Sequence, residues 1–340
     1  MNAIAKPVTH STVLILGGRG RLGLATAHAF AQQGWRVLCQ VRPGASLPMG
    51  GNALPSIQWL EHDLNDTAGL AHAASGAKVV VHALNPTYTN RAWRTQALVM
   101  LERSIEITRA LGATLMLPGN IYNFGADMPA VLREVTPQRA STIKGQIRIG
   151  MEAQLQRSGV RAIVVRAGDF FGSGSGSWFD QTIAGKLSRG VLTYPGDLNI
   201  ATAWAFLPDL ARTFVALAQR RAEMSAFEVF HFAGVQLSGQ QWLDLLNPIA
   251  QSQGWVASGE RLQYRRLPWA VIRVGAWFNP VWGSLQEMRY LWQTPHALDN
   301  TKLVDFLGAE PRTALPLAVE QALTTLGLVS HAPPVHSVVA

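Results

Sequence analysis

A short apolar strand runs directly into a glycine-rich turn near the start of the chain. Residues 12–23 are TVLILGGRGRLG, and the run at 13–16 suits a strand buried on both faces of a parallel sheet. Residues 22–30 continue as the small and apolar residues of a helix. Strand, turn and helix in this order supply the context that a G-x-G-x-x-G motif requires. We therefore expect the chain to begin with one unit of a doubly wound α/β sheet.

The glycines of this turn have separate steric roles. The first pair permits a tight bend, Gly20 leaves room for a pyrophosphate, and Gly23 lets the helix approach the strand. The phosphate then meets the helix N-terminus, whose free N–H groups attract anions. The predicted phosphate-binding residues are Gly17, Gly18, Arg19, Gly20, Arg21, Leu22 and Gly23.

The end of the second predicted strand indicates which dinucleotide binds. An NAD site places Asp or Glu about 20 residues after the glycines, whereas an NADP site places Arg near the 2′-phosphate. No acidic residue occurs between Gly34 and Leu60, while Arg42 follows the strand and Arg19 lies in the turn. We expect NADP(H) as the cofactor in preference to NAD. The alternative is that both arginines are solvated surface charges.

Composition excludes several other classes of protein. The 340 residues are 48% hydrophobic, enough to bury a substantial core in one large or two modest domains. No stretch approaches the roughly 18 apolar residues of a membrane span, so we expect a cytoplasmic protein without a membrane partner. The net charge of +8 comes from scattered arginines, which argues against nucleic acid as a partner. The single Cys39 and the histidine spacing predict no metal site.

Strand-like runs alternate with helical ones through the first half of the chain. The predicted strands are 12–16, 36–41, 57–62, 78–82, 114–117 and 161–166, with helices at 91–111 and from about 141 to 156. This alternation predicts a Rossmann-type doubly wound parallel sheet. The predicted NAD(P)-binding domain covers residues 1–170 and is rejoined by parts of 198–235.

The strict alternation ends after the sixth strand. Residues 172–177, GSGSGS, suit either a lid or a hinge, and seven of the eleven tryptophans follow position 200. We expect a smaller C-terminal substrate lobe built from 171–197 and 236–330, with 331–340 as a tail. Ligands bind where the strand order reverses, so this lobe is expected to cover the nicotinamide.

These features resemble the extended and atypical short-chain dehydrogenase/reductases, the NAD-dependent epimerase/dehydratase group. The resemblance rests on the glycine motif, on His62-Asp63-Leu64, on FLPDLA at 206–211, and on DNTK at 299–302 with Leu307-Gly308. It implies that Asp63 contacts the adenine and that Leu64 lines the adenine pocket. The alternative for Asp63 is a helix N-cap. Ala83, Leu84 and Asn85, after the fourth strand, are expected beside the cofactor.

The catalytic motif of that group is missing. Its members use Tyr-x-x-x-Lys on the helix after the fifth strand, and none of the five tyrosines here has a lysine four places on. Alignment on Glu152 places Lys144 at the tyrosine position and Arg148 at the lysine position. Asn120 likewise stands where a serine or threonine is usual.

The residues that stand in place of this motif resemble those of another branch of the group. Lys144 to Arg148, followed by Glu152, is similar to the helix of the isoflavone-reductase and phenylcoumaran-type reductases, whose lysine is regarded as the proton-transferring group. The segment 118–125 also resembles their loop. A lysine working near neutral pH must lose about 3 pKa units, and we expect Arg148 to contribute to that loss. The alternatives are that Lys144 contacts only the nicotinamide ribose or is a solvated helix residue.

The sequence thus predicts an NADP(H)-dependent oxidoreductase or epimerase-like enzyme acting on a small metabolite. Hydride would move to or from a carbonyl, imine or activated double bond, with Lys144 managing the proton and Asn120 and Tyr122 orienting the substrate. An NADP(H)-binding sensor that signals without turnover is the alternative, favoured by the missing motif. A strict sugar-nucleotide epimerase is disfavoured, because that chemistry needs the lost tyrosine and NAD. The resemblance also implies a homodimer.

Overall fold

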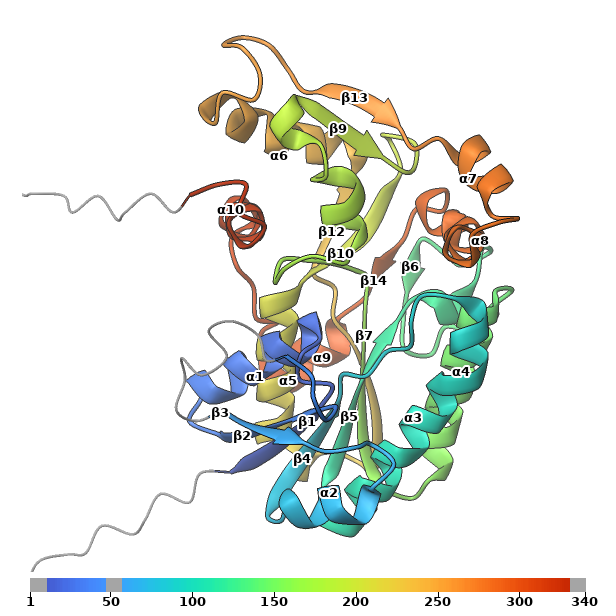
Figure 1. The fold of residues 1–340 in the computed structure, drawn as a ribbon, viewed down its shortest axis with the longest axis vertical. Helices are drawn as coiled ribbons and strands as arrows, with labels where there is room; N and C mark the ends of the chain where they lie inside the picture. The colour runs from blue at the N-terminus through green and yellow to red at the C-terminus, as the bar shows by residue number, and fades with distance from the viewer. Residues whose placement is uncertain (1–10, 47–56, 331–340) are drawn as a thin grey trace, which may run out of the picture.

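A seven-stranded parallel sheet forms the centre of the protein, as seen in a computed structural model that describes residues 11–46 and 57–330 (Figure 1). The spatial order is β11-β7-β5-β4-β1-β2-β3. The strands are β1 (Thr12–Leu16), β2 (Arg36–Val41), β3 (Ile57–Glu61), β4 (Ala77–His82), β5 (Thr114–Asn120), β7 (Arg161–Ala167) and β11 (Phe227–His231). The predicted doubly wound α/β fold is confirmed.

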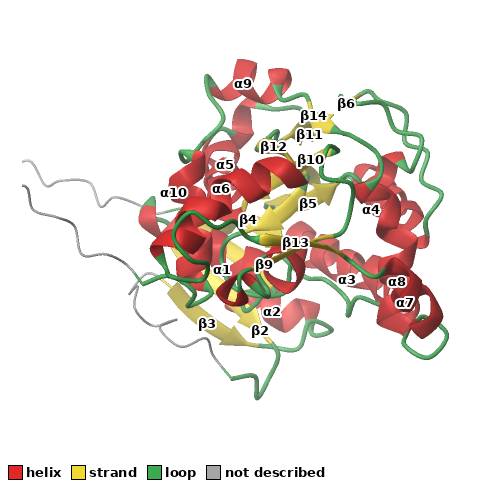
Figure 2. Ribbon diagram, turned by 90° about the horizontal axis from the view of Figure 1, so that it is seen from above, coloured by secondary structure: helices red, strands yellow, loops and turns green. Residues whose placement is uncertain are grey.

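Helices cover both faces of this sheet (Figure 2). Helices α1 (Arg21–Gln32) and α5 (Leu207–Gln219) pack together on one face, and α2 (Thr67–Ala73), α3 (Asn90–Leu111) and α4 (Ile143–Arg157) lie on the other. The strands are therefore buried on both sides, which explains the apolar runs at 13–16 in β1 and 79–81 in β4. Alternate residues of β1 enter two different cores: Val13 and Ile15 face α1 and α5, while Leu14 and Leu16 face α3.

The remaining elements lie beyond the carboxyl ends of the central strands (Figure 1). They comprise the small sheets β8 (Asp169–Phe171) with β10 (Ala201–Phe206) and β12 (Val235–Ser238), β9 (Val191–Tyr194) with β13 (Gln263–Arg266), and β6 (Val131–Leu132) with β14 (Ala297–Leu298). The helices here are α6 (Gly239–Ser252), α7 (Trp269–Gly275), α8 (Pro280–Glu287) and α10 (Leu315–Thr325), while α9 (Thr301–Leu307) packs against β11.

Aromatic side chains form the core of this second lobe. Trp204, Trp242 and Trp292 have no more than 1% of their surface exposed, and the Trp204 and Trp242 ring centroids are 5.1 Å apart in a T-shaped contact. Such rings bury a large apolar area and prefer edge-to-face geometry. The tryptophan enrichment after position 200 is therefore largely a packing feature.

Two predicted helices begin and end at recognisable signals. The side chain of Thr89 caps α3, which stops at Gly112 in the left-handed conformation, and the side chain of Thr142 caps α4. The seventh strand, β11, was not predicted, because the chain reaches it only after a long excursion through the second lobe. The expected tail 331–340 lies outside the described residues. Within those residues, no helix is long and apolar enough to span a bilayer.

Candidate active site

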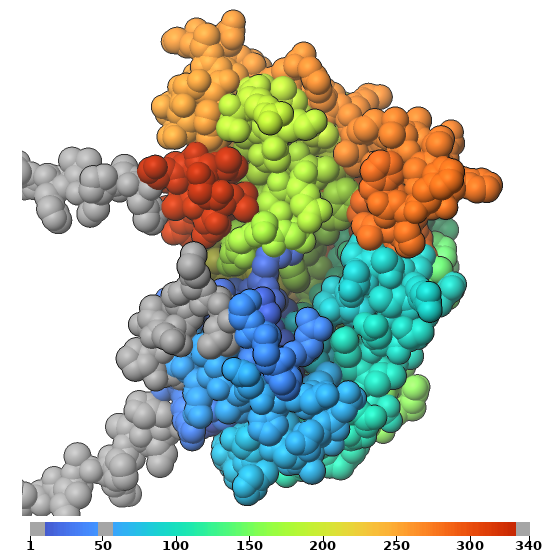
Figure 3. All heavy atoms as spheres, in the orientation of Figure 1, coloured from blue at the N-terminus to red at the C-terminus, as the bar shows by residue number. Residues whose placement is uncertain are grey.

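The glycine turn lies where the strand order reverses. β1 has β2 on one side and β4 on the other, so the connections leave its carboxyl end in opposite directions. Figure 3 shows a hollow on this face between the blue and cyan residues that follow these strands and the second lobe above them. In doubly wound sheets, this is the position where ligands bind.

Backbone geometry explains three of the glycines in the turn. Gly17 has φ +81°, which L side chains rarely adopt, and a Cβ there would lie 3.0 Å from the carbonyl oxygen of Ala83. A Cβ on Gly18 would lie 2.7 Å from that of Cys39, and one on Gly23 only 2.4 Å from the oxygen of Gly17. The backbone of α1 at Gly23 therefore packs directly against the backbone of the turn, with no room for a side chain.

The N-terminus of α1 suits an anion. Gly20, its N-cap, provides no side-chain cap, so the free N–H groups of the first turn face outward. In that turn, Arg21 Nη1 is buried without a hydrogen-bond partner, while Nη2 donates to the oxygen of Gly176 at 3.2 Å. The latter contact places the 172–177 segment beside the turn. The unpaired guanidinium nitrogen and the uncapped helix are what a dinucleotide phosphate would satisfy.

Gln40 was missed by sequence reasoning. This buried side chain near the end of β2 accepts from the N–H of Gly17 at 3.2 Å and donates to the oxygen of His62 at 2.7 Å. It therefore ties the glycine turn to the segment after β3. The available signal was a single amide after the apolar run at 37–39 of the strand RVLCQV.

The predicted adenosine-side residues gather around this turn. Arg42 follows β2 with an exposed side chain, and Arg19 donates to Ser46 Oγ at 3.3 Å. Both arginines are therefore near the loop that begins after β2, at residues 42–46. Asp63 is exposed and accepts from the backbone and side chain of Asn65 at 2.9 and 3.1 Å. The alternative that Asp63 caps a helix is wrong, because Asp66 caps α2.

The neighbouring predicted cofactor residues also lie at this edge of the sheet. Leu64 and Leu84 are half-buried against the core below α3. Ala83 continues β4 and donates its N–H to the oxygen of Leu16 at 2.9 Å, and the next residue but one, Asn85, is exposed. The residues after β1, β3 and β4 therefore meet, as parallel topology requires.

Lys144 lies in the first turn of α4 with none of its surface exposed. Its Nζ donates to Asn90 Oδ1 at 2.5 Å, lies 4.0 Å from Glu287 Oε2, and lies 4.5 Å from the ring centroid of Tyr88. Burial lowers the pKa of Lys144 to about 8, against the opposing effect of Glu287. The alternative of a solvated helix lysine is therefore wrong.

Arg148 does not act on Lys144 as expected. Its Nη1 donates to the oxygen of Pro118 at 3.1 Å, and its guanidinium lies 5.0 Å from the ring centroid of Trp93. The lowered pKa of Lys144 arises from desolvation, with no contribution from the arginine. The expectation that Arg148 lowers this pKa is corrected accordingly: Arg148 joins α4 to β5 and α3.

Two phenols lie beside the lysine. The hydroxyl oxygens of Tyr88 and Tyr122 are 3.5 Å apart, and both side chains are half-buried. Burial raises the pKa of Tyr122 to about 12 and that of Tyr88 well above its usual value, so both remain neutral near pH 7. Asn120 Oδ1 accepts from the N–H of Tyr122 at 3.0 Å, which leaves its amide N–H groups to meet a substrate.

Asp169 is a second residue that sequence reasoning missed. It begins β8, directly after β7, is partly exposed, and its carboxylate makes no hydrogen bond or ion pair with another described residue. Desolvation raises its pKa to about 7. Its charge also raises the pKa values of four phenols: Tyr88, Tyr122, Tyr194 and Tyr290. A lone acid outside any known motif gave no signal in the sequence.

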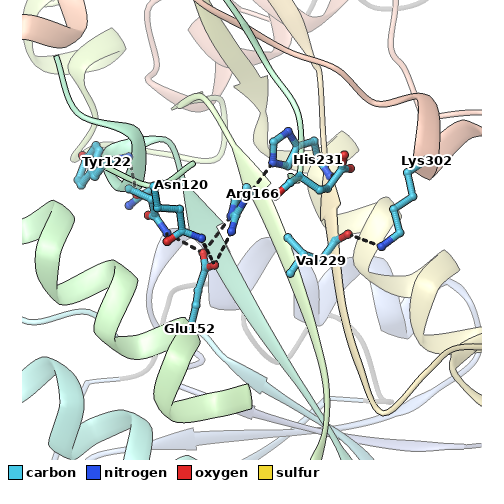
Figure 4. A network of polar contacts seen from close by, with 10 residues as sticks. Asn120, Tyr122, Glu152, Arg166, Val229, His231 and Lys302 are labelled. Atoms are coloured by element: carbon cyan, nitrogen blue, oxygen red, sulfur yellow. Dashed lines mark hydrogen bonds and ion pairs between the residues drawn. The ribbon is translucent and has the colours of Figure 1, made fainter. Parts of the chain in front are cut away.

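A buried ion pair fixes the helix that carries Lys144 (Figure 4). Arg166 on β7 donates to both carboxylate oxygens of Glu152 on α4, at 3.0 and 2.6 Å. Asn123 donates to the same carboxylate at 2.9 Å, and His231 on β11 lies 3.3 Å from Arg166. Burial and Arg166 lower the pKa of His231 to about 4, so the imidazole is neutral. Glu152 is therefore a structural residue that positions α4 on the sheet.

A separate groove lies away from these residues. Its volume is about 700 Å³, and it lies at the outer edge of the sheet near β11 and α9. Its lining includes Arg133, Glu134, Phe230, Asp299, Lys302 and Phe306, and none of the predicted site residues. The candidate site is therefore defined by the strand ends and not by this groove.

The fold and the glycine turn together place the chain in the class of the atypical short-chain dehydrogenase/reductases. The chain belongs to the family described as "RmlD substrate binding domain", whose model matches residues 11–258. No curated protein matches the chain significantly.

Several solved structures with the same fold are described as sugar-nucleotide 4-epimerases. One is the UDP-glucose 4-epimerase of Thermotoga maritima with UDP-glucose, 15% identical, TM-score 0.71, covering 92% of this chain and 98% of that chain. Another is the UDP-Glc/GlcNAc 4-epimerase of Campylobacter jejuni, 14% identical, TM-score 0.71, covering 93% and 98%. The Bordetella bronchiseptica enzyme WbmH in complex with NAD⁺ is 17% identical, with TM-score 0.69 and coverage of 93% and 98%. At such identities the likeness establishes the fold alone.

Proposed function

We propose that the protein is an NADP(H)-dependent oxidoreductase that moves hydride to or from a carbonyl or activated double bond of a small metabolite. The observation that carries this proposal is Lys144, whose pKa is lowered to about 8 at the sheet edge that carries the glycine turn. When bound, the nicotinamide supplies or accepts the hydride. Lys144 transfers the proton, and Asn120 and Tyr122 orient the substrate.

Asp169 also titrates close to neutrality, with a pKa of about 7, and it acts on Tyr88, whose ring lies beside Lys144. Paired variants distinguish the two groups. In reduction, protonated Lys144 is the acid, so kcat/KM should fall as the pH rises through about 8. Lys144→Met should lower kcat by roughly 10²–10⁴-fold and remove that limb of the profile, whereas Asp169→Asn should retain it. The reverse pattern would assign the proton to Asp169.

The preference for NADP is supported by Arg42 and Arg19, which lie near the same loop, and by the absence of an acid between 34 and 60. Several structural neighbours hold NAD, so the cofactor needs a direct test. Binding of NADPH and NADH should be measured by titration calorimetry. Arg42→Ala should weaken NADPH by roughly ten- to a hundredfold and leave NADH unchanged. Equal affinities in the unaltered protein would overturn the assignment to NADP.

A second candidate is an NADP(H)-binding sensor without turnover. The observation that favours it is the complete enclosure of the Lys144 side chain. Nicotinamide absorbance should be followed with NADPH or NADP and fractionated metabolite extract. Turnover that Lys144→Met abolishes supports the enzyme. Tight NADPH binding with no turnover in any fraction supports the sensor.

A further inference from the structure

The α7–α8 hairpin carries the most exposed aromatic side chains in the described structure. Trp277 and Phe278, between the two helices, are 87% and 88% exposed, and Val274 and Val271 on α7 are 65% and 57% exposed. Figure 3 shows this orange region standing out at the edge of the second lobe. A contiguous apolar surface of this kind marks an interaction site.

The hairpin is packed so that these residues are held outward. Trp269 and Ile272 of α7 are buried in the lobe core, which fixes the inner side of that helix. A Cβ on Gly275 would lie 2.2 Å from the Trp282 ring, so the glycine lets α7 and α8 close together. Asn279 caps α8 by accepting from the N–H of Val281 at 2.9 Å. The hairpin is therefore well ordered, and its packing leaves Trp277 and Phe278 exposed.

The segment from β13 to the last turn of α8 carries positive charge, and the acid that ends α8, Glu287, faces Ile143 and Lys144. Residues 261–286 contain Arg261, Arg265, Arg266 and Arg273 and no aspartate or glutamate. Arg261 lies 3.5 Å from Asp244. The other three are exposed and form no ion pair with the described residues. An exposed apolar tip is thus combined with unneutralised positive charge.

We propose that the α7–α8 hairpin docks on an anionic phospholipid surface. Trp277 and Phe278 would enter the boundary between headgroups and acyl chains, where amphipathic rings are favoured, and the arginines would face the lipid phosphates. A symmetric contact between two copies fits less well, because it would bring like-charged arginines together. The proposal is independent of the proposed redox function. It concerns surface contact, whereas the expectation of no membrane partner rested on the lack of a spanning segment.

Flotation of the full chain with vesicles tests this surface. Vesicles of phosphatidylcholine alone should bind weakly, and vesicles with roughly 30% phosphatidylserine should bind much more strongly at low salt. The double variant Trp277→Ser with Phe278→Ser should bind at least about tenfold more weakly. Each of Arg265→Gln, Arg266→Gln and Arg273→Gln should lose roughly fivefold.

Matched controls come from exposed residues elsewhere. Val135→Ser removes an apolar side chain that is 89% exposed, and Arg157→Gln removes an exposed charge on α4. Both should bind like the unaltered chain. Equal binding by the double variant, or no binding to phosphatidylserine vesicles, would overturn the proposal. A dimer in sedimentation velocity that the double variant dissociates would also overturn it, because the tip would then be an interface between copies.

Discussion

At the scale of single residues, burial determines which groups titrate near neutral pH. Lys144 and Asp169 have pKa values shifted in opposite directions, to about 8 and about 7, and in both cases desolvation is the main cause. The sequence indicated Lys144 through its position relative to Glu152. Asp169 could not be found in this way, because its effect arises only where β8 comes close to Tyr88 and to Tyr122.

Asp169 should make stability depend on pH. Its pKa is raised from 3.8 to about 7 by folding, so the folded state retains a proton that the unfolded state releases as the pH rises from about 4 to 7. This group therefore lowers the free energy of unfolding across that range. Asp169→Asn should be more stable than the unaltered chain at pH 8, by at least about 1 kcal/mol, and similar at pH 4. Urea unfolding at both pH values measures the difference, and an equal gain at each would contradict this account.

The Glu152–Arg166 pair should be more important to stability than exposed ion pairs. Glu152→Gln leaves a buried guanidinium without its carboxylate, which should cost about 3–5 kcal/mol in the free energy of unfolding. The matched control is Glu223→Gln, which breaks the exposed pair with Arg220 and should leave the free energy of unfolding nearly unchanged. Similar losses in the two variants would show that Glu152 does not anchor α4.

At the scale of elements, patterns that are local in sequence were predicted well. The first strand and α1 follow from an apolar run and closely spaced glycines, the end of α3 follows from Gly112, and the start of α4 follows from Thr142. The extension of β5 to Asn120 and the seventh strand β11 were missed. Both depend on hydrogen bonding to β7, and the residues of β5 and β11 do not by themselves indicate that pairing.

Two glycines inside helices provide a test of close packing. Gly23→Ala would place a Cβ 2.4 Å from the oxygen of Gly17, so it should destabilise the protein and abolish dinucleotide binding. Gly150→Ala on α4 meets only Leu98 at 3.8 Å and should stabilise the protein by up to about 1 kcal/mol. Thermal unfolding and NADPH titration of both variants check the contrast. Loss of binding in both would mean that the close approach at Gly23 is not the cause.

At the scale of the whole molecule, the site combines two lobes. A ligand that binds only the folded form should stabilise it by about 2.7 kcal/mol at 100 times its Kd. Saturating NADPH should therefore raise the Tm of the full chain, and Gly23→Ala should lack this shift. An unchanged Tm of the unaltered chain with NADPH would contradict binding at the glycine turn. The contacts between the lobes could not be predicted from the sequence, since they join residues nearly 200 positions apart.

The two lobes meet at α8. Ser284 Oγ bonds to both the N–H and the Oδ1 of Asn90, and Glu287 accepts from the N–H of Ile143 beside Lys144. Any separation of α8 from α4 would admit water to the ammonium, and its pKa would return from about 8 toward 10.5. Lobe separation and proton uptake are therefore linked equilibria. Between about pH 8 and pH 10.5, Lys144 holds fewer protons in the closed form than in the open form. A rise in pH through this range therefore favours closure.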